Sequence, residues 1–168
     1  MVKHSLRISL AFFIYFTLIQ DFVIAVLWSL SPFGEAKVGI PYGLLNGINP
    51  FMVFGLALLA NILVFPLMIF FLDKVYFFFT RWTWYKKRAL WIARRAKRGT
   101  GKKLDKYGYF GLALFVMIPL PGTGVYAGTI ATYVFNMERK KAFFANTIGI
   151  TISSMIIWSV TYISAGVL

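Results

Sequence analysis

The chain has 168 residues, of which 60% are hydrophobic, and its formal net charge at pH 7 is +13. A soluble domain of this length has too little interior to hide so much apolar surface, so the composition excludes an ordinary soluble protein and indicates one integral membrane domain over residues 1–168. The absence of cysteine excludes a disulfide framework and a thiolate metal site.

The first apolar segment follows Lys3 and Arg7 and is interrupted by the polar pair Gln20 and Asp21. We expect an N-terminal helix over residues 5–20, which is short for a membrane span and either crosses the bilayer or lies in its interface. The polar pair then marks a break. The alternative is one helix over residues 8–30 that tolerates the pair.

Residues 22–49 contain a turn rich in Pro and Gly and predict a re-entrant hairpin. Lipid cannot satisfy the N–H and C=O groups of such a turn, so turn backbone at membrane depth is tolerated only against protein or a wet cavity. Residues 50–79 predict a transmembrane helix that is kinked at Pro66.

A basic linker over residues 81–106 holds eleven of the 18 Lys and Arg residues, opposed only by Asp105. A short basic loop between apolar blocks is typical of the cytoplasmic side of a membrane, so we expect contact with lipid headgroups and not with nucleic acid. Aromatic residues among the cations predict an amphipathic helix on an anionic leaflet. The residues expected to contact headgroups are Arg81, Trp84, Lys86, Lys87, Arg88, Trp91, Arg94 and Arg95.

Residues 107–135 predict a second re-entrant hairpin, and residues 142–168 predict a second transmembrane helix. The two halves align with a shift of 85 residues, which pairs Gly39 with Gly124 and Asn61 with Asn146. If the linker is cytoplasmic, the two hairpins enter from opposite faces. The sequence therefore predicts an all-α polytopic membrane protein, built as an inverted repeat of a hairpin plus a helix, which suits a transporter.

Glu35, at the first turn, is the leading functional candidate, because a charge at membrane depth is costly and a carboxylate there can exchange a proton. The alternative is a structural pair between Glu35 and Lys37. Gly39 and Pro41 belong to the same turn. Gly39 is also one of several glycines spaced four residues apart, a pattern that lets helices pack closely.

At the second turn, Gly122, Thr123 and Gly124 precede a helix whose N–H groups suit a phosphate or carboxylate, unless the turn needs glycine only for its backbone angles. Asn61 and Asn146 are expected to bond either hairpin backbone or the cargo. Without a nucleophile–base pair or a metal-ligand spacing, the sequence predicts no enzyme activity, no metal and no cofactor.

The two turns together resemble the small multidrug export protein family of prokaryotes, a relative of the DedA/VTT membrane proteins. The resemblance rests on Glu35-Ala36-Lys37-Val38-Gly39-Ile40-Pro41-Tyr42-Gly43, on Pro121 to Gly128, and on Ala145, Asn146 and Gly149. It covers about residues 22–160. It implies paired re-entrant hairpins, a place in the prokaryotic plasma (inner) membrane, and a link to recycling or scrambling of lipids.

These observations lead us to expect a small membrane transporter or lipid flippase that moves an amphiphilic, anionic cargo such as a lipid phosphate. Protons are the expected coupling ion, through Glu35. Membrane lipids are the expected partners, and a homo-oligomer is left open. The alternatives are a passive lipid scramblase or channel, and a membrane assembly factor that uses the basic linker for docking.

Overall fold

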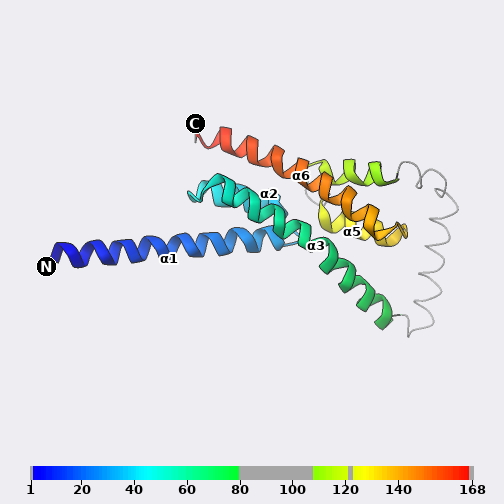
Figure 1. Ribbon diagram of the computed structural model, residues 1–168, viewed down its shortest axis with the longest axis horizontal. Helices are drawn as coiled ribbons and strands as arrows, with labels where there is room; N and C mark the ends of the chain where they lie inside the picture. The colour runs from blue at the N-terminus through cyan, green and yellow to red at the C-terminus, as the bar shows by residue number, and fades with distance from the viewer. Residues whose placement is uncertain (1, 80–107, 121–122, 167–168) are drawn as a thin grey trace. The chain divides into compact units, whose positions relative to one another are not determined.

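The computed structural model describes residues 2–79, 108–120 and 123–166. Within them the chain forms six helices and no strand. Figure 1 shows the course of these helices along the chain. The helices are α1 (Val2–Leu30), α2 (Glu35–Leu45), α3 (Pro50–Phe79), an unlabelled helix over Gly108–Met117, α5 (Val125–Val134) and α6 (Arg139–Ser164). The predicted all-α fold is confirmed for these residues.

Two of the helices are long and apolar enough to cross a membrane. The candidate spans are Pro50–Val75 and Arg139–Ser164, each of 26 residues. At a rise of 1.5 Å per residue, such a helix is about 39 Å long and exceeds the hydrocarbon core of about 30 Å. These spans agree with the transmembrane helices predicted over residues 50–79 and 142–168, although α6 begins three residues earlier than expected.

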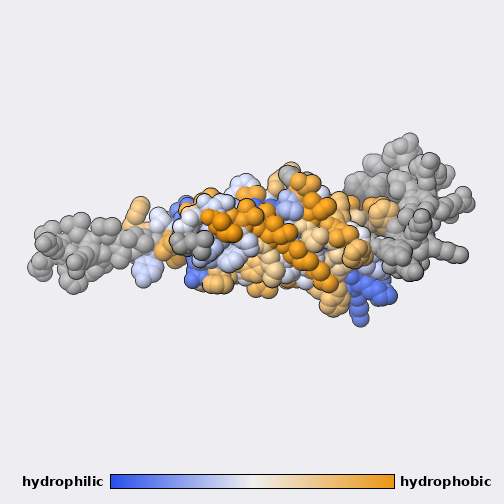
Figure 2. Space-filling model, turned by 90° about the horizontal axis from the view of Figure 1, so that it is seen from above, coloured by the Kyte–Doolittle hydropathy of each residue, from blue (hydrophilic) through white to orange (hydrophobic). Residues whose placement is uncertain are grey.

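Large and small side chains are sorted in the sense expected of a protein in lipid. The exposed positions of the long helices hold large apolar residues, such as Leu59, Leu63, Leu67, Ile148 and Ile156. Their buried positions hold mostly small or polar residues, such as Ala57, Ala60, Ala145, Asn146, Gly149 and Ser153. Small residues let helices approach closely where lipid supplies no hydrophobic drive. Orange, hydrophobic residues accordingly cover much of the coloured surface in Figure 2.

The break predicted at Gln20 and Asp21 is absent, because α1 runs without interruption from Val2 to Leu30. Neither residue removes a backbone donor as proline would, and no glycine or proline lies between residues 2 and 30. The Asp21 carboxylate accepts a hydrogen bond of 2.9 Å from the Tyr42 hydroxyl on α2. The alternative of one helix through the polar pair is therefore the correct one.

The chain divides into two compact units. The first comprises Met1–Ala60 and Ser154–Leu168. Its core is formed by residues of α1, α2 and the start of α3, among them Ala25, Ile40 and Val53. From α6, Trp158 packs against this core and donates its indole N–H to the Pro50 carbonyl at 3.0 Å. The first turn is therefore held by a core of its own.

The second unit comprises Asn61–Ser153. In it the helix Gly108–Met117 meets α6 at backbone distance, since a Cβ added to Gly149 would lie 2.6 Å from the Ala113 carbonyl oxygen. The rings of Phe65 and Phe143 meet edge to face, with centroids 5.6 Å apart. Arg139 makes two hydrogen bonds, of 2.8 and 2.9 Å, to the Asp73 carboxylate. This bidentate ion pair joins the C-terminal part of α3 to the start of α6.

The shorter helices α2 and α5 end in the same capped turn. The backbone N–H groups of Asn46, Gly47 and Ile48 donate to the carbonyls of residues four, three and five positions earlier. Those of Phe135, Asn136 and Met137 do the same. Gly47 and Asn136 both have positive φ, 73° and 52°, as this type of helix cap requires. Equivalent positions of the two turns are thus 89 residues apart.

Burial is compatible with this offset, and nearly as many buried positions coincide at 85 residues because both shifts keep the same helix face. Five buried positions of α2 correspond to buried positions of α5 or of Gly124, the residue just before it. The pairs are Glu35 with Gly124, Ala36 with Val125, Gly39 with Gly128, Ile40 with Thr129, and Gly43 with Thr132. In α3 and α6, the buried positions Val53, Ala57, Ala60 and Asn61 correspond to Ala142, Asn146, Gly149 and Ile150. Each pair is buried at both positions. The two segments therefore share one local pattern of a short helix, a capped turn and a long helix.

The capped turns and the starts of α3 and α6 place corresponding positions 89 residues apart, four more than the predicted shift of 85 residues. Glycine and alanine recur at four-residue spacing in both segments, so their identities match almost as well one helical turn out of register. In the register of the capped turns Asn61 corresponds to Ile150 and Asn146 corresponds to Ala57.

Candidate functional site

The first turn places an acidic residue in a strained backbone conformation. After α1 ends at Leu30, the N–H groups of Gly34 and Glu35 both donate to the Ser31 carbonyl, at 3.2 and 3.0 Å. Glu35 then begins α2 with a φ of 53°. Among the described residues only Glu35 and Asn136 are non-glycine residues with positive φ. Such a conformation costs on the order of 1–3 kcal/mol and is concentrated at functional sites.

The Glu35 side chain is buried beside a cation of intermediate exposure. The side chains of Glu35 and Lys37 are only 6% and 13% exposed, and the Lys37 Nζ lies 3.5 Å from the Glu35 Oε2. Two charges removed from water must be compensated by each other and by further hydrogen bonds, and the balance is often unfavourable to stability. The backbone strain at Glu35 and the desolvation of its ion pair with Lys37 both lower stability. A glycine could form the same turn without either effect.

Gly39 and Pro41 shape the helix that carries this pair. A Cβ on Gly39 would overlap the Ser29 hydroxyl and lie 2.6 Å from the Ala25 carbonyl, so α1 and α2 touch at this point. Pro41 lies inside α2 and has no N–H to donate to the Lys37 carbonyl one turn earlier. Gly39 therefore serves close packing, and Pro41 modifies the hydrogen bonding of the turn that holds Lys37.

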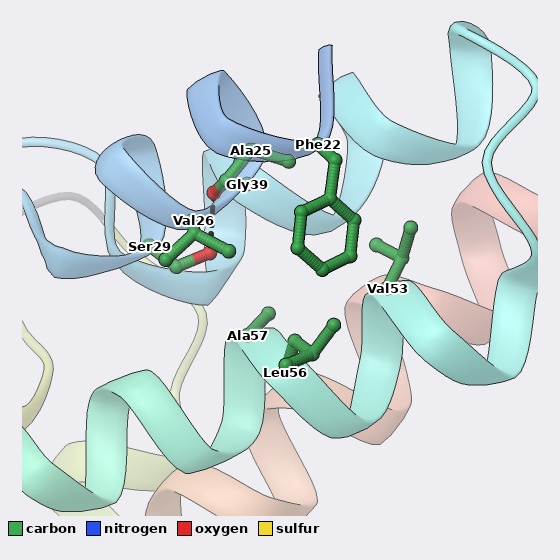
Figure 3. A pocket seen from close by; sticks show the side chains of 8 residues that line it. All are labelled: Phe22, Ala25, Val26, Ser29, Gly39, Val53, Leu56 and Ala57. Atoms are coloured by element: carbon green, nitrogen blue, oxygen red, sulfur yellow. Dashed lines mark hydrogen bonds between the residues drawn. The ribbon is translucent and has the colours of Figure 1, made fainter. Parts of the chain in front are cut away.

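The space beside Gly39 is too small to be a binding pocket. Figure 3 shows it between α1, α2 and α3, with the Ser29 hydroxyl turned toward the Ala25 carbonyl, to which it donates a bond of 2.8 Å. Its volume is about 10 Å³, and apolar side chains such as Phe22, Val53 and Leu56 line it. A water molecule needs at least this volume and two to four polar partners. The space is a packing defect of a dry helix interface.

The second turn directs its polar group inward. The Thr123 hydroxyl donates to carbonyls of its own turn, with Ile118 at 2.6 Å and Leu120 at 2.9 Å. Gly124 is buried and has a φ of −135°, an extended conformation that other residues also adopt. The positive φ considered for this glycine is thus absent, and Gly122 lies outside the described residues. Thr123 closes the turn, so the predicted anion cradle must depend on backbone N–H groups.

The two asparagines occupy fully buried positions, and Asn146 contacts the second hairpin. Its side-chain nitrogen lies 3.5 Å from both the Val125 carbonyl and the Thr129 hydroxyl, while its oxygen faces Gly128. A Cβ at Gly128 would come within 2.6 Å of that oxygen. The contact supports the structural alternative for Asn146, in which the side chain bonds hairpin backbone. Asn61 is equally buried, on α3.

Several buried hydroxyl groups were not anticipated from the sequence. Thr129 and Thr132 donate to the carbonyls four residues earlier in α5, at 2.6 and 2.8 Å. Ser153 and Ser154 are fully buried in α6, and within the described residues their hydroxyl groups have no hydrogen-bond partner. A pair of serines in the middle of an apolar span was the signal available for them. All four lie on the buried side of their helices.

The predicted headgroup contacts, from Arg81 to Arg95, lie outside the described residues, as does the whole linker over residues 81–106. In the described part of the chain, no group of three or more His, Cys, Asp or Glu side chains converges. Of the predicted site residues, the structure thus brings together Glu35 and Lys37, with Gly39 and Pro41 on the same helix. It keeps Thr123, Gly124 and Asn146 in the second unit.

Comparison with known proteins gives one result that bears on this arrangement. No curated protein and no solved structure matches the chain. A family model described as "Putative small multi-drug export protein" matches residues 35–156, a stretch that begins at Glu35, just after the first turn, and includes the second turn, the first candidate span and most of the second. The matched stretch is well over half of the chain, which therefore belongs to this family of small multi-drug export proteins.

Proposed function

We propose that the protein is a small membrane transporter or lipid flippase that moves an amphiphilic, anionic cargo, and that Glu35 carries a proton during the cycle. The single observation that carries this proposal is the Glu35–Lys37 ion pair, whose carboxylate is buried at a position of unfavourable backbone conformation. Ionisable residues at membrane depth are costly and are typical of proton and substrate pathways. Family membership supports export as the kind of activity.

The proposal includes two re-entrant hairpins arranged as an inverted repeat: the second over residues 107–135, and the first formed by the C-terminal part of the continuous helix α1 and by α2, where a separate hairpin over residues 22–49 was predicted. Support comes from the shared pattern of caps and burial at an offset of 89 residues. It also comes from the shortness of Gly108–Met117, α2 and α5, none of which is long enough to cross the hydrocarbon core. Matched broken segments in the two halves of a chain point to the binding site of a transporter.

The first test is a flux measurement on the purified protein in vesicles of phosphatidylethanolamine and phosphatidylglycerol, with fluorescent phosphatidylglycerol as the probe. Transport that requires an imposed pH gradient supports the proposal. Lipid exchange that ignores the gradient would instead favour the passive scramblase. If the vesicles behave like protein-free ones, the assembly factor becomes the better description.

The second test separates a proton carrier from a structural ion pair. Glu35→Gln keeps the shape of the side chain but removes its titration, so for a carrier we expect normal folding and gradient-driven flux at the level of empty vesicles. For a purely structural pair, the same change leaves Lys37 without its carboxylate partner at a site where its side chain is only 13% exposed, and costs about 3–5 kcal/mol. Thermal unfolding in detergent distinguishes these outcomes.

The double variant Glu35→Gln with Lys37→Met provides the control. It removes both charges, so the structural pair predicts recovery of stability and of flux together. Recovery of gradient-driven flux in this variant would refute the role of Glu35 as a proton carrier. Recovery of stability without flux is the result expected of a carrier.

A further inference from the structure

The second unit contains a large apolar groove that the Glu35 site does not use. Its volume is about 550 Å³, within the range of about 300–1,000 Å³ typical of small-molecule sites. The helix Gly108–Met117 forms one side, and α6 forms the other, from Lys141 to Ile152. We refer to this space as the α6 groove.

The α6 groove arises from the distribution of side-chain size along the two helices. Where they meet, the residues are Ala113, Ala145 and Gly149, and the backbones approach so closely that Gly149 has no room for a Cβ. The larger lining residues are exposed, with Phe110 and Phe144 at 66% and 63%. Small residues thus form the floor and large ones the rim, which leaves an open channel along the helix pair.

One end of the α6 groove is polar and the rest is not. Lys141 and Tyr109 line it at the start of α6, and the Tyr109 hydroxyl accepts a hydrogen bond of 3.1 Å from the Glu138 N–H. From Lys141 to Ile152 the helix rises by about 16 Å, close to half of a hydrocarbon core of about 30 Å. The groove is therefore amphipathic and as long as one leaflet is deep.

The charges at the polar end favour an anion. Residues 138–141 contain three cations and one acid, Glu138, whose carboxylate lies 2.6 Å from the Lys141 Nζ. Arg139 is engaged by Asp73 through its two hydrogen bonds. A phosphate at this end would compete with Glu138 for Lys141, which lines the groove, whereas Lys140 does not. An apolar channel that begins at a lysine and a tyrosine matches a lipid with a negatively charged headgroup.

We propose that the α6 groove binds one acyl chain of an anionic phospholipid, with the phosphate held by Lys141 and Tyr109. This deepens the proposed function, on which the interpretation of the bound lipid as cargo rests. The binding itself does not depend on Glu35 or on a proton gradient. It is a property of the second unit, so it can be measured without transport.

The test uses the full-length protein in vesicles that contain phosphatidylglycerol with a photoreactive group in its acyl chain, followed by mapping of the cross-linked residues by mass spectrometry. We expect labels on groove residues such as Leu114 and Ile148, and more labelling by phosphatidylglycerol than by phosphatidylcholine with the same chain. Equal labelling by the two lipids, or labels spread evenly over other exposed residues, would overturn the proposal.

Two matched pairs of variants sharpen the result. Lys141→Gln should reduce groove labelling by phosphatidylglycerol about two- to fivefold, the effect of one exposed ionic contact, whereas Lys140→Gln on the same turn should not. Ile148→Trp should fill the channel and reduce labelling with either lipid, whereas Met155→Trp, exposed on α6 but outside the groove, should not. All four sites have exposed side chains, so folding should survive, and circular dichroism checks this.

The outcomes for binding and for transport separate cleanly. Specific labelling of the α6 groove in a protein that shows no flux supports the lipid site. The same result refutes the proposal that the protein is a transporter. Gradient-driven flux with unspecific labelling refutes the lipid site and leaves the transporter. A Lys141→Gln variant that labels as strongly as the unchanged protein refutes the assignment of the phosphate to Lys141.

Discussion

At the scale of single residues, position 47 isolates the effect of backbone conformation. Gly47 follows α2 with a φ of 73°, and a Cβ added to it would meet no atom within 4 Å. The equivalent residue after α5 is Asn136, which adopts the same conformation. Asparagine is the residue that best replaces glycine there, because its short polar side chain tolerates positive φ.

We therefore expect Gly47→Asn to change the free energy of unfolding by a few tenths of a kcal/mol and Gly47→Val to lower it by about 1–2 kcal/mol. Thermal unfolding in detergent measures both. Because the site has open space around it, packing cannot explain a difference. Equal stability of the two variants would show that this cap does not hold the turn.

Some side-chain contacts of single residues can be predicted from the sequence, and others cannot. A pair between Glu35 and Lys37 could be predicted, because opposite charges two residues apart in an apolar stretch have no other charged partner nearby in the sequence. Thr123 was predicted only as part of a turn before a helix whose N–H groups suit an anion, and the bonds of its hydroxyl to the turn that contains it were not predicted. Side-chain direction in a turn depends on backbone angles that composition does not specify.

At the scale of elements, two glycines inside helices differ in how closely their neighbours approach. Gly39 lies in α2 against the Ala25 carbonyl of α1, whereas Gly55 in α3 has open space at its Cβ position. An added methyl group must displace backbone at the first site and meets nothing at the second. In open helix positions alanine is favoured over glycine by about 1 kcal/mol.

Gly39→Ala should consequently destabilise the protein by about 1–3 kcal/mol, the usual cost of overpacking a tight contact. Gly55→Ala should leave the stability unchanged or raise it. Comparing the two unfolding temperatures under one set of conditions checks the prediction. A Gly39→Ala protein as stable as the Gly55→Ala protein would mean that α1 and α2 do not touch as described.

Helix boundaries were predicted well where a long apolar run indicates the helix. They were predicted poorly where a polar pair of residues was the only signal of a boundary. The two long spans followed from uninterrupted apolar runs. The break at Gln20 and Asp21 was wrong, because a polar pair does not end a helix unless it removes a backbone donor or adopts a special conformation. The predicted repeat register differs by one turn from that of the capped turns, because a four-residue stripe of small residues looks alike at neighbouring turns.

At the scale of the whole molecule, the predicted topology can be tested with single cysteines, since the chain has none. We expect Thr100→Cys, in the basic linker, to be protected from an impermeant thiol reagent added to intact cells. Asn46→Cys, in the loop after α2, should react, because the inverted arrangement places it on the outer face. The motivation is the excess of eleven cations over one acid in residues 81–106.

Permeabilised cells provide the control for reactivity at position 100. If Thr100→Cys reacts from outside in intact cells, the linker is not cytoplasmic. If both positions are protected in intact cells but react after permeabilisation, the two loops share the inner face and the inverted arrangement is wrong.

The recurrence of burial after 89 residues also has a consequence for how the protein tolerates mutation. Positions that share an environment should share a response, so a scan of all single substitutions should yield a tolerance profile that correlates with itself at this separation. At a separation of 85 most buried positions also coincide, because four residues turn a helix by only about 40° more than one full revolution, so the two separations should differ chiefly at the capped turns, where Gly47 corresponds to Asn136. The positions that break the correlation, Glu35 against Gly124 above all, would then mark where the two halves have acquired different tasks.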